Sequence, residues 1–338
     1  MIDWTRLEKA PRILLEAELR PAQGGRFQPT GFADLGAAEY ERPTAEGGVQ
    51  KMLLVESAQS VANRLEQTGL DGDGPDIAPE LKGLPYVAAT LEGVEPKVRT
   101  SSLVEAHRLG SPYFLLNKQF KEKLAKEMAY NPKRPLDWKP IYATLFRYDP
   151  NSLLHGVFLS LLDGARVRAP RALTGFIEAE DVSRVISGGV KNSPVDPTGE
   201  LQVADDSETR EKGVYSNVPY PRIEYTAGRI KAYFNIDLAL IHGYKLSMDA
   251  ERLLVSLALL KIRRFLSARL RLRTACDLQL AADVKATAPE GFAVPNEEAL
   301  LTAVQEGIVA CKPLFHDPPV TEFVTKVKRK PNAEAARA

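Results

Sequence analysis

The sequence predicts a globular chain that mixes α-helices and β-strands. Strand-like and helix-like hydrophobic patterns alternate along its length. Such alternation is not expected of an all-helical or an all-strand protein. Hydrophobic residues make up 44% and charged residues 26%, which is ordinary for a soluble globular protein. The 338 residues allow two domains or one large domain with insertions, and they can bury a sizeable core without disulfides.

Charge and cysteine content exclude several classes of protein. Lys and Arg number 45 against 44 Asp and Glu, so the net charge of +1 does not indicate a nucleic-acid binder. The two cysteines, Cys276 and Cys311, cannot form a disulfide framework, which favours a reducing compartment. Residues 1–20 lack the apolar core of a signal peptide, and the apolar run 253–260 is too short to span a membrane. We therefore expect a cytoplasmic protein that makes no membrane contact.

The first half of the chain alternates strands, loops and helices. Residues 12–20 predict a strand with apolar side chains on one face, and residues 21–48 predict a loop rich in Gly and Pro. An apolar stripe at helical spacing predicts a helix over 52–66. Further predicted elements are strands at 86–92 and 97–103 and helices at 119–130 and 152–162.

The second half contains an unusual segment, residues 181–221, dominated by Gly, Ser, Asn, Pro and acidic residues. A structureless loop of this length is uncommon in a compact domain and is usually functional or mobile, so we interpret it as a protruding excursion. Other predicted elements are strands at 170–179, 222–241 and 269–280 and helices at 253–265 and 296–310. We expect one domain over 1–325, with an insertion region at about 67–150, and a basic, disordered tail at 326–338.

The sequence carries no recognisable catalytic or metal-binding motif. Its four histidines are isolated, and neither Cys-x-x-Cys nor H-E-x-x-H spacing occurs. Phosphate loops, dinucleotide fingerprints and nucleophile elbows are absent as well. Asp34 could act as an acid in a nuclease, although a lone loop Asp is more often a turn residue. We therefore predict no cofactor, no metal and no catalytic residue.

A run of basic residues is the first feature that indicates binding. Six bases and no acid occupy 261–273. From Arg269 the apolar period becomes two, which predicts a strand with Arg269, Arg271 and Arg273 in a row on one face, about 7 Å apart. Such a row suits a phosphate backbone, and a solvated strand face explains it equally well.

A glycine pair near the predicted first helix is the second such feature. Gly47 and Gly48 lead through Gln50 and Lys51 into that helix, and a glycine-rich turn at a helix N-terminus can bind anions. The exposed side of the helix carries amides and hydroxyls, which from physics alone favours an ordinary polar surface.

Three longer segments resemble one protein family. LLVESAQSVANRLE, LRLRTACDLQL and GVYSNVPYPRIEYTAGRIKAYFNIDLALI together resemble the repeated backbone subunit of type I CRISPR interference complexes (Cascade), in the subtype I-U or I-G variant, within the RAMP superfamily. The resemblance implies an α+β fold: an RRM-like (ferredoxin-like) palm with a β-hairpin thumb and helical insertions. It also implies copies stacked head to tail along one guide RNA.

The resemblance further implies which residues bind RNA. In such families the loop after the first strand and the following helix hold the RNA backbone, and the thumb wedges between bases. The 181–221 excursion matches the thumb in position, with Val214, Tyr215 and Val218 as wedge residues. The sequence lacks a glycine-rich RAMP signature and an RNP-type aromatic pair, which favours backbone contacts over base stacking. Together with the arginine row, the RNA-binding residues expected are Arg26, Gln50, Lys51, Gln59, Asn63, Arg64, Arg269, Arg271 and Arg273.

The resulting hypothesis is a non-catalytic scaffold that polymerises on CRISPR guide RNA and presents it for pairing with target DNA. Its partners would be further copies of itself and other effector-complex subunits. Type III relatives cut RNA with a loop Asp, but the residues that flank Asp34 do not match theirs. Two alternatives stay open: a RAMP-class endoribonuclease using His242-Gly243-Tyr244-Lys245, and a metabolic α+β enzyme whose arginine row binds a phosphorylated substrate.

Overall fold

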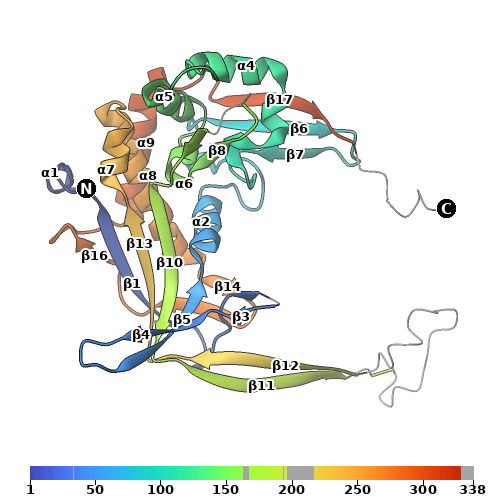
Figure 1. Ribbon diagram of the computed structural model, residues 1–338, viewed down its shortest axis with the longest axis vertical. Coiled ribbons are helices and arrows are strands. Elements are labelled where there is room, and N and C mark those ends of the chain that lie inside the picture. The colour runs from blue at the N-terminus through green and yellow to red at the C-terminus, as the bar shows by residue number, and fades with distance from the viewer. Residues whose placement is uncertain (33, 163–166, 193, 196–216, 329–338) are drawn as a thin grey trace.

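The chain folds around a large curled antiparallel sheet, drawn in Figure 1. The computed structural model describes residues 1–32, 34–162, 167–192, 194–195 and 217–328. Neighbouring strands follow the order β14-β15-β1-β13-β10-β5-β4, and β16 also pairs with β1. These strands are β1 (Ile13–Pro21), β4 (Glu39–Pro43), β5 (Val49–Glu56), β10 (Leu173–Glu180), β13 (Arg229–Ile236), β14 (Arg271–Arg273), β15 (Cys276–Leu280) and β16 (Lys285–Ala288).

Helices cover one face of this sheet. In β1 the side chains of Ile13, Leu15, Ala17 and Leu19 are all buried, as the period of two predicts. Helix α2 packs on β10, and α8 packs on β13 and β15, while α7 and α9 contact α8 in turn. The helices of this layer are α1 (Trp4–Leu7), α2 (Ala58–Gln67), α7 (Leu238–Gly243), α8 (Met248–Ala268) and α9 (Glu297–Cys311).

Serine side chains begin the two helices that lie against the sheet. Ser57 Oγ accepts a hydrogen bond from the backbone N–H of Ser60 at 3.3 Å, and Ser247 does the same for Ala250 at 3.3 Å. Each serine satisfies a backbone donor that the first turn leaves free. The caps therefore fix where α2 and α8 start relative to the strands before them.

A second sheet of three strands is built mainly from the predicted insertion region (Figure 1). Its middle strand β6 pairs in parallel with β17 and antiparallel with β7. One face of β6 joins the core of the main sheet, while Tyr86 and Ala88 on its other face form a small second cluster with Leu103. The strands are β6 (Tyr86–Glu92), β7 (Val98–Ser101) and β17 (Val320–Lys326); around them lie α3 (Pro112–Leu115), α4 (Lys118–Glu127), α5 (Trp138–Tyr148), α6 (Asn151–His155), β8 (Val157–Leu159), β9 (Val167–Ala169) and three 3₁₀ turns, η1 (Pro79–Leu81), η2 (Arg108–Gly110) and η3 (Lys312–Leu314).

A hairpin of two long strands projects from the main sheet between β10 and β13 (Figure 1). Its strands are β11 (Ser183–Asn192) and β12 (Asn217–Thr226), and together they form a separate two-stranded sheet. The sequence predicted an excursion at 181–221, and its described ends are regular strands rather than a structureless loop. Beside the base of the hairpin lies a short ribbon of β2 (Gly31–Phe32) and β3 (Gly36–Ala37).

Several predicted boundaries are wrong for one physical reason. The predicted helix over 52–66 is a strand up to Glu56 and a helix from Ala58, because Met52, Leu53 and Val55 are buried within a sheet that offers partners on both sides. Apolar runs alone do not distinguish a buried strand from a buried helix. The same ambiguity affects 152–162, which is α6 followed by β8, and 222–241, which contains the end of β12, then β13 and the start of α7.

Two predicted irregular segments contain strands. The predicted loop 21–48 includes β2, β3 and β4, and the predicted tail 326–338 begins on the last residue of β17. Both were missed because Gly, Pro and charged residues interrupt the pattern, while the pairing partner lies far away in sequence. Residues 329–338 lie outside the described part of the chain.

Candidate nucleic-acid interface

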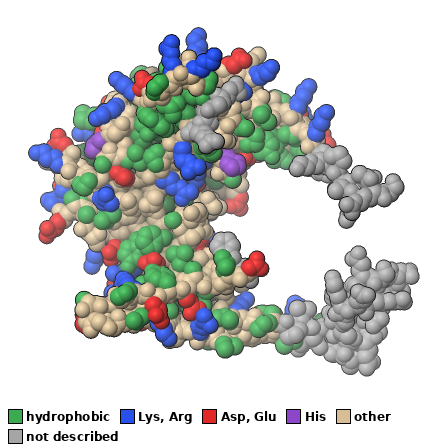
Figure 2. Space-filling view, viewed as in Figure 1, with side chains coloured by type: hydrophobic (Ala, Val, Ile, Leu, Met, Phe, Trp, Pro, Cys, Tyr) green, Lys and Arg blue, Asp and Glu red, His purple; other side chains and the backbone are tan. Residues whose placement is uncertain are grey.

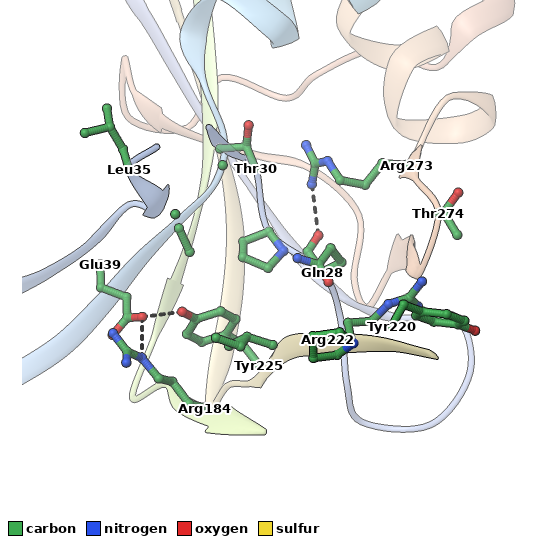
Figure 3. Close-up of a pocket in the computed structure, with 16 residues that line it drawn as sticks. Gln28, Thr30, Leu35, Glu39, Arg184, Tyr220, Arg222, Tyr225, Arg273 and Thr274 are labelled. Carbon is green, nitrogen blue, oxygen red and sulfur yellow. Dashed lines mark hydrogen bonds and ion pairs between the residues drawn. The ribbon is translucent and has the colours of Figure 1, made fainter. Parts of the chain in front are cut away.

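A groove with a cavity volume of about 880 Å³ lies at the base of the projecting hairpin (Figure 3). Its walls come from the loop after β1, the β2–β3 ribbon, the hairpin and the turn after β14. The charged and aromatic residues that line it are Glu39, Arg184, Tyr220, Arg222, Tyr225 and Arg273. Three arginines and one carboxylate line the groove, so cationic side chains are in excess there. Arg184 is paired with Glu39 and Arg273 with Glu56, which leaves Arg222 as the lining arginine best placed for a phosphate.

One wall of the groove is fixed by a carboxylate bridge between the hairpin and β4. Arg184 Nε donates to Glu39 Oε1 at 2.7 Å, and the Tyr225 hydroxyl donates to the same oxygen (Figure 3). Burial would raise the pKa of Glu39, but the hydrogen bonds from Arg184 and Tyr225 outweigh it and hold that pKa below its usual value. Burial and the bond to Glu39 raise the pKa of Tyr225. The bridge therefore stays intact at neutral pH.

The hairpin presents an aromatic ring and apolar side chains to solvent. Tyr220 is 48% exposed, and the Arg222 guanidinium carbon lies 5.7 Å from the centre of its ring. A ring paired with a cation offers a stacking surface for a base. Ile186 and Ile223 face each other across the hairpin and are exposed, as is Val190. Exposed apolar groups on a projecting element mark an interaction surface.

Behind the groove lies a buried carboxylate that the sequence did not single out. Glu56, the last residue of β5, is 0% exposed and accepts a hydrogen bond from Arg64 Nε at 3.0 Å. It also forms an ion pair with Arg273. Arg273 Nη1 donates to the backbone oxygens of Gln28 at 3.0 Å and Val55 at 3.1 Å (the bond to Gln28 is drawn in Figure 3). Arg273 thus connects the loop after β1 to the end of β5.

The structure brings five of the predicted RNA-binding residues together around α2. Gln59 and Asn63 lie on its exposed side, and Arg64 Nη1 donates to the backbone oxygen of Arg271 at 3.4 Å. Asn63 and Arg269 line a second cavity of about 450 Å³. Figure 2 shows that the molecule is hollowed between the hairpin and the second sheet. Glu66, Asp73 and Glu105 line the same cavity as Asn63 and Arg269, so the surface beside α2 carries amides and charges of both signs.

Gln50 and Lys51 lie elsewhere, on β5 opposite β4. Gln50 Nε2 donates to Asp181 Oδ1 at 3.1 Å, which engages this side chain within the protein. Gly47 and Gly48 form the turn between β4 and β5 instead of leading into a helix. The predicted anion site at a helix N-terminus is therefore wrong, because the strand β5 separates the glycines from α2.

The remaining predicted residues belong to the hairpin and its surroundings. Arg26 Nη1 lies 3.4 Å from Glu224 Oε2, so this side chain is held against the hairpin. Val218 lies in β12 opposite Lys191. The other two predicted wedge residues, Val214 and Tyr215, lie outside the described residues.

The arginine row does not form. The predicted strand 269–280 is a hairpin of β14 and β15, and Arg269 is the C-cap of α8 rather than a strand residue. Arg271 is exposed, whereas Arg273 points inward to Glu56. The alternating pattern was correctly recognised, but a turn at Thr274 divides the strand and gives the three guanidiniums different surroundings.

The catalytic alternatives gain no support from the geometry. Asp34 is exposed in the turn between β2 and β3. His242 Nδ1 lies 2.6 Å from Glu251 Oε2, while the buried Tyr244 hydroxyl donates to the backbone oxygen of Leu153 at 3.0 Å. The two residues therefore have different partners in different places. Within the described residues, no three His, Cys, Asp or Glu side chains could hold a metal ion.

Sequence reasoning missed the aromatic groups. Phe176 and Tyr233 stack across β10 and β13 with ring centres 5.1 Å apart and planes at 25°, although no aromatic pair was expected on the strands. Tyr233 lies opposite Glu16 of β1, and Lys231 lies beside its ring, so this face carries charges of both signs. Tyr220 and Arg222 in the groove were missed as well; their alternation in YPRIEY at 220–225 was the available signal.

Comparison with known proteins identifies the family. The family model for CRISPR-associated protein GSU0053 matches residues 13–184, so the chain belongs to this CRISPR-associated family. The resemblance to a CRISPR-associated family, noted from the sequence, is confirmed. No curated protein sequence matches the chain.

Two solved structures are distantly similar. One is described as a "CRISPR RNA-guided surveillance complex, pre-nicking": it is 14% identical, the match covers 79% of this chain and 76% of that chain, and the TM-score is 0.35. The other is Csc2 of Thermofilum pendens, 10% identical over 92% of this chain and 80% of that chain, with a TM-score of 0.32. In the part of the chain that the structure describes, no helix is long and apolar enough to cross a membrane.

Proposed function

We propose that this protein is a non-catalytic backbone subunit of a type I CRISPR effector complex, and that it binds guide RNA in the cytoplasm. The observation that carries the proposal is the basic groove at the base of the hairpin, in a chain that belongs to a CRISPR-associated family. The groove offers guanidiniums and an exposed tyrosine. Such groups hold phosphates and stack on any base, so binding would not depend on base sequence.

The strand order supports an RRM-like palm. Four central strands follow the spatial order β15-β1-β13-β10, and all neighbours are antiparallel. Helix α2 lies in the chain between β1 and β10, and α8 lies between β13 and β15. This is the βαββαβ connectivity of a ferredoxin-like fold. On this interpretation the β11–β12 hairpin, between the second and third palm strands, is the thumb, and the second sheet with its helices is the insertion.

The proposed assembly follows from a projecting thumb and an RNA-binding palm on one chain. Copies would lie head to tail along the guide RNA, each thumb reaching the next copy. Contacts of this kind are heterologous and give open helical filaments. The guide would then pair with target DNA, and other effector subunits would bind the ends of the filament.

The proposal is tested by purification and by assembly. Protein expressed with its guide RNA should co-purify with nucleic acid, seen as a raised ratio of absorbance at 260 to 280 nm. Light scattering on a ladder of RNA lengths should show particle masses that increase in steps. A protein that purifies free of RNA and stays monomeric on every RNA would contradict the proposal. Cleavage of repeat RNA by the purified protein would instead favour the endoribonuclease.

A further inference from the structure

The junction between β5 and α2 is organised around one buried carboxylate, Glu56. Ser60 and Arg64 from α2 donate hydrogen bonds to one of its oxygens, and Arg273 from β14 forms an ion pair with the other. Ser60 and Arg64 lie in the first and second turns of α2, so the helix is tied to the end of its own preceding strand. The side chain of Glu56 is 0% exposed, whereas those of Arg64 and Arg273 are 21% and 24% exposed.

Both guanidiniums use their other N–H groups on backbone carbonyls. Arg273 donates to Gln28 and Val55. Arg64 donates to the carbonyls of Arg271 and Leu272. The cluster therefore joins the loop after β1, the consecutive elements β5 and α2, and the distant strand β14. Three of them carry predicted RNA-binding residues or line the groove.

The charges of the cluster explain why Glu56 is needed. The side chains of Arg64 and Arg273 are mostly withdrawn from water, and this burial lowers the pKa of both guanidiniums. Two guanidiniums that share one partner repel each other, and a carboxylate between them offsets this repulsion. Glu56 is the carboxylate that contacts both.

We propose that Glu56 is a positioning residue that holds Arg64 and Arg273 as internal clamps and so sets the shape of the RNA groove. On this interpretation, which rests on the proposed function, Arg64 and Arg273 do not contact phosphates. The exposed Arg271 next to them does.

The salt dependence of RNA binding separates clamps from phosphate ligands. Each phosphate contact contributes roughly one unit to the slope of log K against log salt. Arg271→Gln should lower the slope by about one unit, whereas Arg64→Gln and Glu56→Gln should leave the slope unchanged. Arg64→Gln and Glu56→Gln should each weaken RNA binding at every salt concentration, and the loss should be about tenfold for Glu56→Gln.

A matched control lies in the second sheet. Asp76 also accepts hydrogen bonds from an arginine, Arg99, and from a hydroxyl, Tyr86, but it is 46% exposed and far from the groove. Asp76→Asn should therefore change thermal stability slightly and leave RNA affinity within about twofold. If Glu56→Gln does not fold, Ser60→Ala removes one donor to Glu56 and leaves every charge in place. A two- to fivefold loss of affinity at constant slope is then expected, on the order of one weakened hydrogen bond.

Each outcome supports or overturns the role of Glu56. A slope that falls by one unit in Arg64→Gln would show that Arg64 is a phosphate ligand, and wild-type affinity in Glu56→Gln or in Ser60→Ala would show that the cluster does not shape the groove. Either result overturns this inference while the proposed function stands. Failure of the unmodified protein to bind RNA would instead overturn the proposed function itself.

Discussion

The two sheets of the molecule use arginine in opposite proportions. Next to the groove, two guanidiniums share the single carboxylate of Glu56, which is fully buried. In the second sheet a single guanidinium, Arg99, lies between two carboxylates, Asp76 at 3.0 Å and Glu322 at 2.8 Å. The first cluster leaves one positive charge beside the groove, and the second leaves one negative charge at the opposite end. The comparison teaches that clusters of opposite local charge coexist in a chain whose total charge is only +1.

Charge reversal of Arg222 in the groove together with Arg271 beside α2 should give the largest effect. Arg222→Glu combined with Arg271→Glu should reduce RNA affinity by at least about a hundredfold at moderate salt, because two attractive sites become repulsive. Both side chains are exposed or partly exposed, so the double variant should have the melting temperature of the unmodified protein. Fluorescence anisotropy with labelled RNA measures the loss.

The control for that experiment is a double variant with the same change in net charge at a site far from the groove. Lys118→Glu with Lys126→Glu alters α4, above the second sheet, and should cost less than about threefold at about 0.15 M salt because of screening. Equal losses in both double variants would show that only total charge matters and would remove the regional distinction.

The next largest effect concerns stability, because the two arginine clusters should contribute differently to the free energy of unfolding. Arg273→Ala removes one of the two cations that contact the buried Glu56. It should lower the free energy of unfolding by about 3 kcal/mol. Arg99→Ala removes a more exposed group with exposed partners and should cost about 1 kcal/mol or less. Urea unfolding followed by circular dichroism gives both values. A larger loss in Arg99→Ala would reverse the comparison.

Substitution of Tyr220 in the groove should have a smaller effect on RNA affinity, and this effect should not depend on salt concentration. Tyr220→Ala should weaken RNA binding by about 1 kcal/mol through lost stacking, and Tyr220→Phe should retain it. The salt slope should be the same in both variants, since no phosphate contact is lost. If Tyr220→Phe is as weak as Tyr220→Ala, then the hydroxyl matters and not the ring.

The smallest effect concerns pH and the insertion region. Burial raises the pKa of Asp149 to about 6, above its ordinary value. The folded state therefore holds this proton more tightly than the unfolded chain, and lowering the pH from 7 toward 5 should favour folding at this site by about 1 kcal/mol. Asp149→Asn should remove that contribution. It is measured as the difference between the two proteins in how their urea midpoints change with pH, and identical pH profiles would contradict it.

The sequence predicted the elements better than the site, and particular residues show why. The period of two in residues 12–20 and the helical pattern of 296–310 depend on neighbours in the chain, and both predicted elements are confirmed. The arginine row failed because Arg273 has its partner, Glu56, more than two hundred residues earlier. No local pattern reveals such a pair. Tyr220 and Arg222 could have been found by alternation, but the groove itself is made by four separated segments.

Strand β17 has a consequence for the order of biosynthesis. It completes the second sheet by pairing in parallel with β6, although the two are separated by most of the chain. During translation, β6 leaves the ribosome long before β17 does, and until then one edge of β6 has open backbone donors and acceptors. Exposed edges invite pairing with other chains, so nascent chains need protection during this interval. A ribosome stalled before codon 320 should therefore hold a palm that is largely paired beside an insertion that still lacks its last strand.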